Sequence, residues 1–146
     1  MKNIEIVELK TREEILQGFP VMNQLRTHLT PDSYLELVQE AQEKEGYKIF
    51  ALLEDNSIVA VCGCQPMITL YYDGKYIWVC DLVTDENKRS NGYGRKLLEF
   101  VENWAKENDY KGVSLSSGLQ RTSAHRFYEE KMGYDKVSYV FKKSLD

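Results

Sequence analysis

The residues from Arg89 to Gly94 have the composition of an anion-binding loop. Gly92 and Gly94 lack a Cβ atom, so the chain can turn sharply here and a ligand can approach its main chain. An amphipathic helix is expected from Arg95, and its first turn would present unpaired N–H groups and the positive end of the helix dipole. Arg89, Arg95 and Lys96 add full positive charges. We therefore expect a phosphate or pyrophosphate bound mainly by main-chain amides. The candidate binding residues are Arg89, Ser90, Asn91, Gly92, Tyr93, Gly94 and Arg95.

Two other phosphate-binding loops do not match these residues. A P-loop requires Gly-Lys followed by Ser or Thr, whereas this chain has Gly94-Arg95-Lys96-Leu97 and lacks the hydroxyl that would hold magnesium. A dinucleotide-binding fingerprint requires three glycines and an acidic residue at the end of the next strand, but the next expected strand ends in Ser116-Ser117. On the glycine pair alone, an ordinary tight connection with a solvated basic face is the alternative.

The composition of the chain is that of one folded domain. Its 146 residues are enough for a self-sufficient core, and we expect a single domain over residues 1–146. The formal net charge of −4 argues against a nucleic-acid partner. The N-terminus lacks the apolar core of a signal peptide, and no apolar stretch reaches bilayer length. We expect a cytoplasmic protein with no membrane partner, and a homodimer is left open.

Hydrophobic periodicity and turn residues predict an α/β chain with the element order β-αα-ββββ-α-β-α-β. The expected strands cover 4–9, 49–53, 58–65, 67–72, 75–84, 113–117 and 137–143, and the expected helices cover 11–25, 30–41, 95–108 and 122–132. Pro66 and Asp73-Gly74 separate strands of the central meander. Thr11 with Glu14 has the pattern of a capping box. These elements predict a mixed, mostly antiparallel twisted sheet with helices on both faces.

The three cysteines do not have the spacing of a metal site. Cys62-Gly63-Cys64 is too closely spaced for a zinc knuckle, no second ligand pair follows, and the chain has only two histidines. We expect Cys62, Cys64 and Cys80 to be buried thiols that act as small hydrophobes. The prediction requires neither a metal nor a covalent intermediate on a cysteine.

Three short runs, in this order, carry a family resemblance. Leu82-Val83-Thr84 precedes the glycine loop, Arg89-x-x-Gly92-x-Gly94 forms it, and AHRFYEEKMGY at 124–134 follows one helix and one strand later. Together they resemble the GNAT superfamily of N-acetyltransferases, most clearly in the second half of the chain. The resemblance implies the GNAT fold, one acetyltransferase domain, and acetyl-CoA as the ligand whose pyrophosphate fills the loop. The stretch 121–128 is also similar to acetyltransferases of small molecules, including those acting on aminoalkylphosphonates and aminoglycosides.

The resemblance implies roles for particular residues. The main chain of Leu82, Val83 and Thr84 matches the strand that binds the pantetheine arm of CoA as an added strand. Tyr128 matches the tyrosine whose hydroxyl protonates the departing thiolate, although its residue type and spacing alone also allow a packing role. Many relatives have asparagine where this chain has Arg121. We therefore transfer no asparagine role and expect Arg121 only as an anion ligand.

Asp81 is the candidate for the amine side of the reaction. A protonated amine has no lone pair, so a group must accept its proton before it attacks a thioester. Asp81 directly precedes Leu82, and alternation would place it on one strand face with Val79 and Val83. There it would bind the ammonium and accept its proton, while a purely structural strand-end carboxylate is the equal alternative. The residues expected to line the acceptor pocket are Arg26, His28, Tyr34, Tyr71 and Tyr72.

These residues predict an acetyl-CoA-dependent transfer to a primary amine of a small molecule, by direct attack on the thioester. Tyr128 would be the acid and Asp81 the base. Two alternatives are left open by the sequence. The acceptor could be a protein N-terminus or a lysine, or the chain could be a sensor that binds acyl-CoA without turnover.

Overall fold

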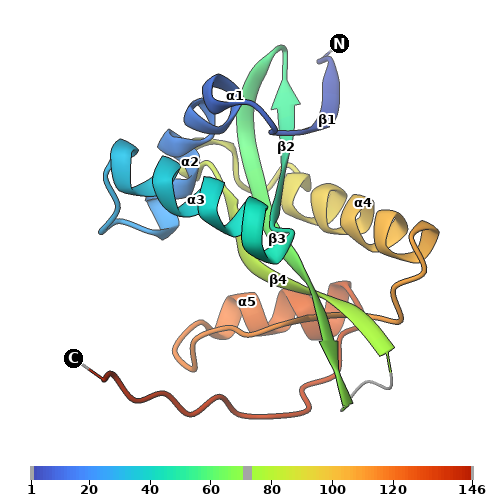
Figure 1. Cartoon of the computed structure of the whole chain (residues 1–146). Coiled ribbons are helices and arrows are strands. Elements are labelled where there is room, and N and C mark those ends of the chain that lie inside the picture. The colour runs from blue at the N-terminus through green and yellow to red at the C-terminus, as the bar shows by residue number, and fades with distance from the viewer. Residues whose placement is uncertain (1, 71–73, 146) are drawn as a thin grey trace. The chain divides into compact units, whose positions relative to one another are not determined.

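The computed structural model describes residues 2–70 and 74–145, and it divides into two compact units, Met1–Ser114 and Leu115–Asp146. The elements up to the boundary are β1 (Ile4–Glu8), α1 (Arg12–Gln17), α2 (Phe19–Leu25), α3 (Pro31–Glu45), β2 (Lys48–Glu54), β3 (Ser57–Thr69), β4 (Gly74–Thr84), η2 (Glu86–Lys88), α4 (Tyr93–Glu107) and β5 (Val113–Leu115). The second unit holds α5 (Thr122–Arg126) and η3 (Phe127–Lys131). The predicted mixed α/β class is confirmed (Figure 1). A single domain over the whole chain stays a prediction.

The first unit is built on a sheet that has, among the described residues, five strands in the order β1-β2-β3-β4-β5. Strands β1 to β4 pair antiparallel with their neighbours. The chain then passes through α4 and returns beside β4, where Lys111 N donates to Lys75 O at 2.8 Å and Ile77 N donates to Gly112 O at 2.9 Å. Both bonds involve the first residues of β4, whereas the candidate residues 82–84 are at its other end.

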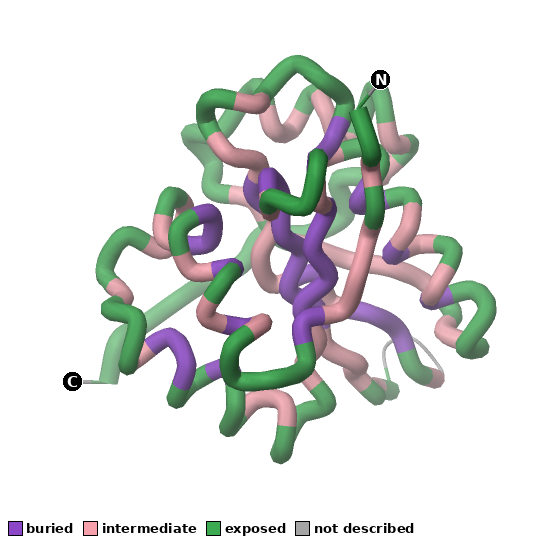
Figure 2. Tube along the Cα trace, turned by 90° about the horizontal axis from the view of Figure 1, so that it is seen from above, coloured by how far each residue is buried: buried purple, intermediate pink, exposed green. Residues whose placement is uncertain are grey.

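Helices cover both faces of this sheet, as the sequence predicts. On one face, α1, α2 and α3 share a buried core with strand residues that include Ile49 and Ala51. On the other face, the ring of Phe50 packs against Phe100 of α4, with centroids 5.4 Å apart. Neighbours along β2 therefore belong to different layers, because side chains alternate along a strand. Figure 2 shows that the buried residues concentrate on the central strands.

Local capping signals set where the first helices begin. Thr11 Oγ1 accepts from Glu14 N at 3.1 Å, and Glu14 Oε1 accepts from Thr11 N at 2.9 Å, so the predicted capping box is confirmed. Thr30 caps α3 in the same way. The single helix expected over 11–25 is instead two helices separated by Gly18. Pro20 lies in the first turn of α2, where its missing N–H interrupts no helical hydrogen bond.

The strands expected at 58–65 and 67–72 are one strand, β3. The central meander therefore has three strands, β2 to β4, and not the four that were expected. β3 pairs with β4 as far as Thr69, but it pairs with β2 only as far as Cys64. Beyond Cys64 no described strand covers that edge, so the missing N–H of Pro66 costs no bond on that side. The expected turn at Asp73-Gly74 falls partly on residues 71–73, outside the described residues.

The second unit begins its helix at Thr122, and the five-residue turn that follows is π-helical. The strand expected over 137–143 is not formed, and the side chains of Val137, Tyr139 and Phe141 are 73%, 69% and 94% exposed. Alternating apolar residues favour a strand only where a partner edge and a core face accept them. The exposed side chains show that no core face covers this segment, which corrects the last element of the expected order.

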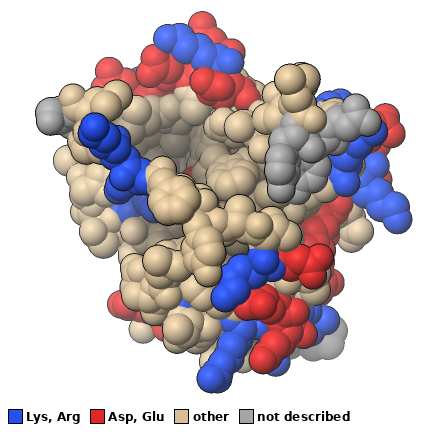
Figure 3. Space-filling model, turned by 90° about the horizontal axis from the view of Figure 1, so that it is seen from below, with Lys and Arg blue, Asp and Glu red and all other residues tan. Residues whose placement is uncertain are grey.

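The surface shows charges of both signs. On the face drawn in Figure 3, acidic and basic side chains lie next to one another and no broad basic stripe is present. Such a stripe is what binds a nucleic-acid backbone. No helix within 2–70 or 74–145 is long and apolar enough to cross a bilayer.

Candidate functional site

The end of β4 leads directly into the glycine loop. Leu82, Val83 and Thr84 pair with residues 60–62 of β3, and Val83 is buried in the core. The short turn η2 follows, in which the side chain of Asp85 accepts from Asn87 N at 3.0 Å. Only residues 85–92 separate the last residue of β4 from the first residue of α4.

Two residues of this loop have left-handed backbone, with φ of 70° at Ser90 and 76° at Gly92. Gly92 is the residue that precedes α4, and no side chain caps this helix end among the described residues. A Cβ atom at Gly92 would meet nothing within 4 Å, so open space lies beside it. Asn91 Nδ2 donates to Lys88 O at 2.9 Å and closes the loop on itself. The first N–H groups of α4 are therefore available to a ligand.

The basic residues predicted beside the loop lie at the surface. Arg89 Nε donates to Thr84 O at 3.3 Å, and Arg95 forms an exposed ion pair with Glu99 one helical turn away, at 2.8 Å. A Cβ atom at Gly94 would lie 3.4 Å from Thr84 Oγ1, an ordinary contact, which shows how closely α4 approaches the end of β4.

A buried carboxylate at the end of β2 connects the two ends of the loop. Glu54 is 8% exposed and accepts hydrogen bonds from the hydroxyl of Tyr93, in the first turn of α4, and from Lys88 Nζ at 2.9 Å. Lys2 Nζ lies 3.7 Å from the same carboxylate. The hydrogen bonds from Tyr93 and Lys88 lower the pKa of Glu54, and they raise the pKa of both donors. The loop is thus anchored to the sheet at both of its ends.

A second polar cluster surrounds Asp81. Its Oδ1 accepts from Arg26 Nε at 2.8 Å, and its Oδ2 accepts from the hydroxyl of Tyr47 at 2.7 Å. Arg26 Nη2 also donates to Cys80 O at 2.8 Å, which fixes the plane of the guanidinium. The side chain of Asp81 is 13% exposed and that of Arg26 is 41% exposed. Burial first, and Asp81 second, raise the pKa of Tyr47 well above its ordinary value.

A bulge in β4 decides which way Asp81 points. Gly63 pairs with Asp81 and Cys64 pairs with Val79, so Cys80 is an extra residue in β4. Paired residues of neighbouring strands share a face, whereas Gly63 and Cys64 are consecutive and point to opposite faces. Asp81 therefore does not share a face with Val79, which corrects the expectation from simple alternation.

Gly63 makes the contact between Tyr47 and Asp81 possible. A Cβ atom at this glycine would lie 1.9 Å from the Tyr47 hydroxyl oxygen and 2.6 Å from Asp81 Oδ2. Any side chain here would displace one partner or both. The positions of the Tyr47 hydroxyl and the Asp81 carboxylate therefore depend on the missing side chain of Gly63.

The thiols are free. Cys62 and Cys64 are buried, as predicted, and Cys80 is half-buried. Burial raises the pKa of Cys62 and is also the main cause that raises the pKa of Cys64 to about 12 and of Cys80 to about 11. Because the thiolate is the nucleophilic form, these shifts disfavour a covalent cysteine step at neutral pH.

Tyr128 and Arg121 lie in the second unit. Tyr128 is half-buried in η3, and its ring centroid is 5.3 Å from that of Phe127 and 6.1 Å from that of Tyr134. Arg121 is exposed and directly precedes α5, and its N–H donates to Gly118 O at 3.0 Å. The aromatic contacts hold the ring of Tyr128, and its role as an acid stays a prediction.

The residues expected to line an acceptor pocket have different positions. The structure brings Arg26 to Asp81, and it places His28 in the exposed turn between α2 and α3. Tyr34 is 1% exposed and its hydroxyl donates to Ile15 O at 2.7 Å, so it is a core residue and not part of a pocket wall. Its spacing on α3 matched the buried face of that helix. Tyr71 and Tyr72 lie outside the described residues.

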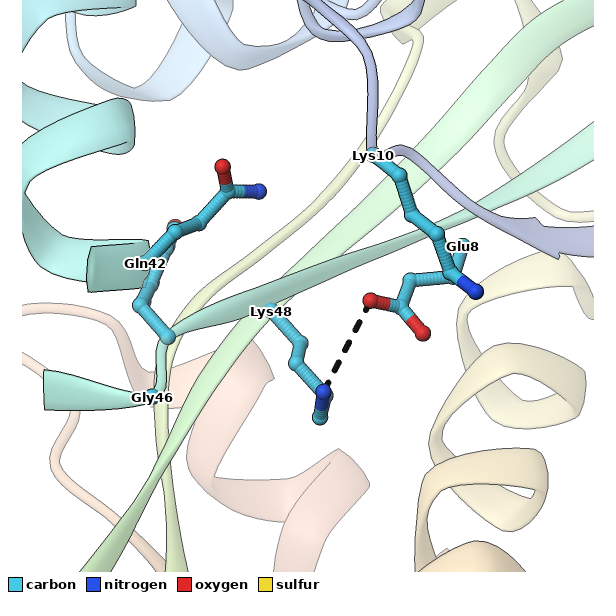
Figure 4. Close-up of a pocket in the computed structure, with 6 residues that line it drawn as sticks. Glu8, Lys10, Gln42, Gly46 and Lys48 are labelled. Atoms are coloured by element: carbon cyan, nitrogen blue, oxygen red, sulfur yellow. Dashed lines mark ion pairs between the residues drawn. The ribbon is translucent and has the colours of Figure 1, made fainter.

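An open depression of about 220 Å³ lies elsewhere in the first unit, near the start of β2 (Figure 4). Lys48 Nζ and Glu8 Oε2 form an ion pair across it at 3.7 Å. Its lining residues are Glu8, Lys10, Gln42, Gly46, Tyr47 and Lys48. None of them is a predicted site residue, and of the six only Tyr47 takes part in the chemistry derived below, through its hydrogen bond to Asp81.

The sequence did not indicate Glu54 or Tyr47. Glu54 follows an apolar run and precedes a turn, where a solvent-exposed carboxylate is common. Tyr47 lies near the start of an expected strand, where an aromatic residue is common. Their partners are 39 and 34 positions away along the chain. Of the two, only Tyr47 had an indirect signal, which was Gly63 between two strand cysteines, since an isolated glycine in a strand marks a close approach.

Comparison with known proteins gives a consistent result. The sequence model of the acetyltransferase (GNAT) family matches residues 11–134. YhdJ of Bacillus subtilis (strain 168), named as an uncharacterized N-acetyltransferase, is 43% identical over 142 residues, which are 97% of this chain and 99% of that protein.

Solved structures share the fold at lower identity. A transcriptional regulator from Bacillus halodurans C-125 superposes with a TM-score of 0.85 at 21% identity, covering 98% of this chain and 100% of the other. The aminoglycoside N-acetyltransferase AAC(6')-Iy, solved in complex with CoA, has a TM-score of 0.85 at 12% identity, covering 100% of this chain and 97% of the other. At these identities the likeness shows the fold alone.

Proposed function

The chain belongs to the acetyltransferase (GNAT) family and is an N-acetyltransferase, and on this premise we propose that it transfers the acetyl group of acetyl-CoA to a primary amine of a small molecule. One observation carries the proposal, namely the loop between β4 and α4. Its left-handed residues and the uncapped first turn of α4 leave main-chain N–H groups beside open space. Arg89 lies at the surface of this loop, and Arg95 lies at the surface of the first turn of α4.

The residues of this loop fit the pyrophosphate of CoA. Amides from Gly92 to Arg95 would bind its oxygens at the positive end of the α4 dipole, with the arginines adding charge. The main chain of residues 82–84 would hold the pantetheine arm, and Arg121 would serve as a further anion ligand. When bound, acetyl-CoA supplies a thioester carbonyl for attack and a thiolate as the leaving group.

The acceptor amine would bind at Asp81. Each carboxylate oxygen has two lone pairs, and each oxygen of Asp81 accepts one hydrogen bond within the protein. Counting the contacts of the described residues, one acceptor position per oxygen remains for an ammonium group. Asp81 would take the proton of that group, directly or through water, and the Tyr128 hydroxyl would give a proton to the departing sulfur.

That the protein is cytoplasmic stays a prediction.

The test is a thiol-release assay with acetyl-CoA and a panel of amines. The panel contains amino acids, aminophosphonates, polyamines, aminoglycosides and a lysine-containing peptide, with acetyl-CoA binding measured separately by calorimetry. Release of CoA with a small amine supports the proposal. Release with the peptide alone would favour a protein acceptor, and tight binding without release under any condition would identify a sensor.

Replacing Tyr128 with Phe tests the acid. The variant keeps the ring contacts and removes the hydroxyl, so turnover should fall by about 10² or more while the Kd of acetyl-CoA stays unchanged. Tyr139→Phe removes a hydroxyl from a residue that is 69% exposed in the same unit and serves as the control. Unchanged turnover in Tyr128→Phe would remove this residue from the mechanism.

A further inference from the structure

The cluster around Asp81 contains more than a carboxylate. Asp81 and Arg26 form a charge pair, with Asp81 Oδ1 and Arg26 Nε 2.8 Å apart. The guanidinium uses Nε for Asp81 and Nη2 for the carbonyl of Cys80. Its other terminal nitrogen, Nη1, has no partner among the described residues, and the Arg26 side chain is 41% exposed. A guanidinium has five donors, so most of its capacity to bind an anion is unused.

The charge of this pair restricts the acceptor. Asp81 and Arg26 sum to zero, so a simple ammonium bound at Asp81 would leave an uncompensated positive charge beside the Arg26 guanidinium. Bringing like charges together in a partly desolvated site is unfavourable. An acceptor that carries an acidic group close to its amine brings no net charge, because its ammonium meets Asp81 while its acid meets Arg26.

The spacing of the two partners also restricts the acceptor. Because both groups contact a single ion pair, the amine and the acid of the acceptor must be only a few bonds apart. Carboxylates and phosphonates both accept two parallel hydrogen bonds from a guanidinium. A polycationic acceptor would instead need several carboxylates. The described polar contacts of Asp81 are with Arg26 and Tyr47, and neither of these side chains is a second carboxylate.

We propose that Arg26 and Asp81 together select a short zwitterionic acceptor, an amine with a carboxylate or phosphonate a few bonds away. This inference rests on the proposed function and narrows its substrate class. Arg26 is the residue that recognises the acid, and Tyr47 is a positioning residue that holds the Asp81 carboxylate in place.

The experiment compares matched amines on the same enzyme preparation. β-Alanine is paired with propylamine and 2-aminoethylphosphonate with ethylamine, so that each pair differs in its acid, and spermidine represents polycations. We expect kcat/KM to be at least about tenfold higher for the acidic member of a pair, the factor that 1.4 kcal/mol of selective binding gives. The two pairs distinguish a carboxylate from a phosphonate acceptor.

Variants of Arg26 identify the source of the preference. Arg26→Gln should bring the ratio of kcat/KM within each pair close to one, and Arg26→Lys should restore part of it, because lysine keeps the charge but not the planar fork. Tyr47→Phe should lower kcat/KM for both members of a pair and leave the ratio unchanged. Because the ratio compares two substrates of one preparation, it does not depend on the fraction of folded enzyme.

The outcomes separate this inference from the function on which it rests. CoA release that is equal or faster with propylamine, ethylamine or spermidine would overturn the zwitterionic acceptor and leave the acetyltransferase proposal standing. A preference for acidic amines that survives in Arg26→Gln would overturn the role of Arg26. No CoA release with any amine, despite acetyl-CoA binding, would overturn the proposed function and this inference with it.

Discussion

At the scale of single residues, Gly63 has the largest effect on the candidate acceptor site. A Cβ atom there would overlap the Tyr47 hydroxyl oxygen at 1.9 Å and would lie 2.6 Å from Asp81 Oδ2. Gly63→Ala should therefore destabilise the protein by about 1–3 kcal/mol, the usual cost of overpacking a closely packed site. Urea unfolding measures this loss. The double variant Gly63→Ala/Tyr47→Phe should lose less than the sum of the single changes, because the overlapping oxygen is gone.

The control for Gly63 is Gly94. An added methyl group at Gly94 would make an ordinary contact at 3.4 Å with Thr84, so Gly94→Ala should leave the free energy of unfolding unchanged or slightly higher. If Gly63→Ala lowers the free energy of unfolding no more than Gly94→Ala does, the Tyr47–Asp81 contact adjusts freely to the added methyl group. In that case the glycine would have no special part in placing the carboxylate.

Gly92 tests the phosphate loop at the same scale. Its φ of 76° disfavours any β-branched residue, although nothing lies within 4 Å of the position that its side chain would take. Gly92→Val should raise the Kd of CoA by about tenfold or more, since about 1–3 kcal/mol of backbone strain would distort the amides at the start of α4. Gly46→Val places the same residue at a φ of 70° after α3 and should lower stability without changing the Kd. Normal CoA binding by Gly92→Val would contradict the loop assignment.

At the scale of elements, the end of β2 organises the connection from β4 to α4. Glu54 binds Lys88 on the strand side of the loop and Tyr93 on the helix side. Glu54→Gln keeps the shape of the side chain and removes its charge, so both bonds weaken. The Kd of CoA should rise several-fold, and kcat at saturating acetyl-CoA should change little. Calorimetry with CoA, and with pantetheine as a ligand that lacks the phosphates, separates the loop from the rest of the site.

The matched control is Glu40→Gln on α3. Glu40 is paired with Lys44 at the surface, at 2.8 Å, and exposed pairs contribute little. CoA binding should therefore not change in this variant. If Glu54→Gln weakens pantetheine as strongly as it weakens CoA, the effect does not act through the phosphate loop.

At the scale of the whole molecule, the features that could be predicted are those that depend on neighbours in sequence. The caps at Thr11 and Thr30, the glycine loop and the buried stripe of α4 follow from residues within one or two turns. The tolerance of β3 for Pro66 could not be predicted, because it depends on where β2 stops pairing. The strand expected over 137–143 failed for a related reason, since a periodic pattern does not specify a partner edge.

The candidate site shows the same division between local and distant contacts. The anion loop is continuous in sequence and could be recognised from its residues. The orientation of Asp81 depends on the bulge at Cys80, and its partners Arg26 and Tyr47 are 55 and 34 positions away. A bulge reverses the face of every residue beyond it, so alternation counted from Val79 gives the wrong face. Only the paired register supplies this information.

The Glu54 cluster also predicts how stability depends on pH. The pKa of Glu54 lies below its ordinary value of 4.5 in the folded protein, so the unfolded chain binds this proton more tightly. Its contribution is therefore complete above pH 4.5 and is lost as the pH falls through the lowered pKa. For Tyr93 and Lys88 the pKa is raised from ordinary values of 10.0 and 10.5, so their contribution is complete below those values and is lost as the pH rises through the raised ones.

The difference in Tm between wild type and Glu54→Gln measures this cluster, because other groups titrate alike in both proteins. The difference should be constant between about pH 5 and 9 and should shrink on either side of that range. On the acid side, protonated Glu54 resembles glutamine. On the alkaline side, a neutral Lys88 no longer pairs with the carboxylate, and an ionised Tyr93 repels it. A Tm difference as large near pH 3 as near pH 7 would contradict a role for the charge of Glu54, because protonated Glu54 and glutamine are both neutral.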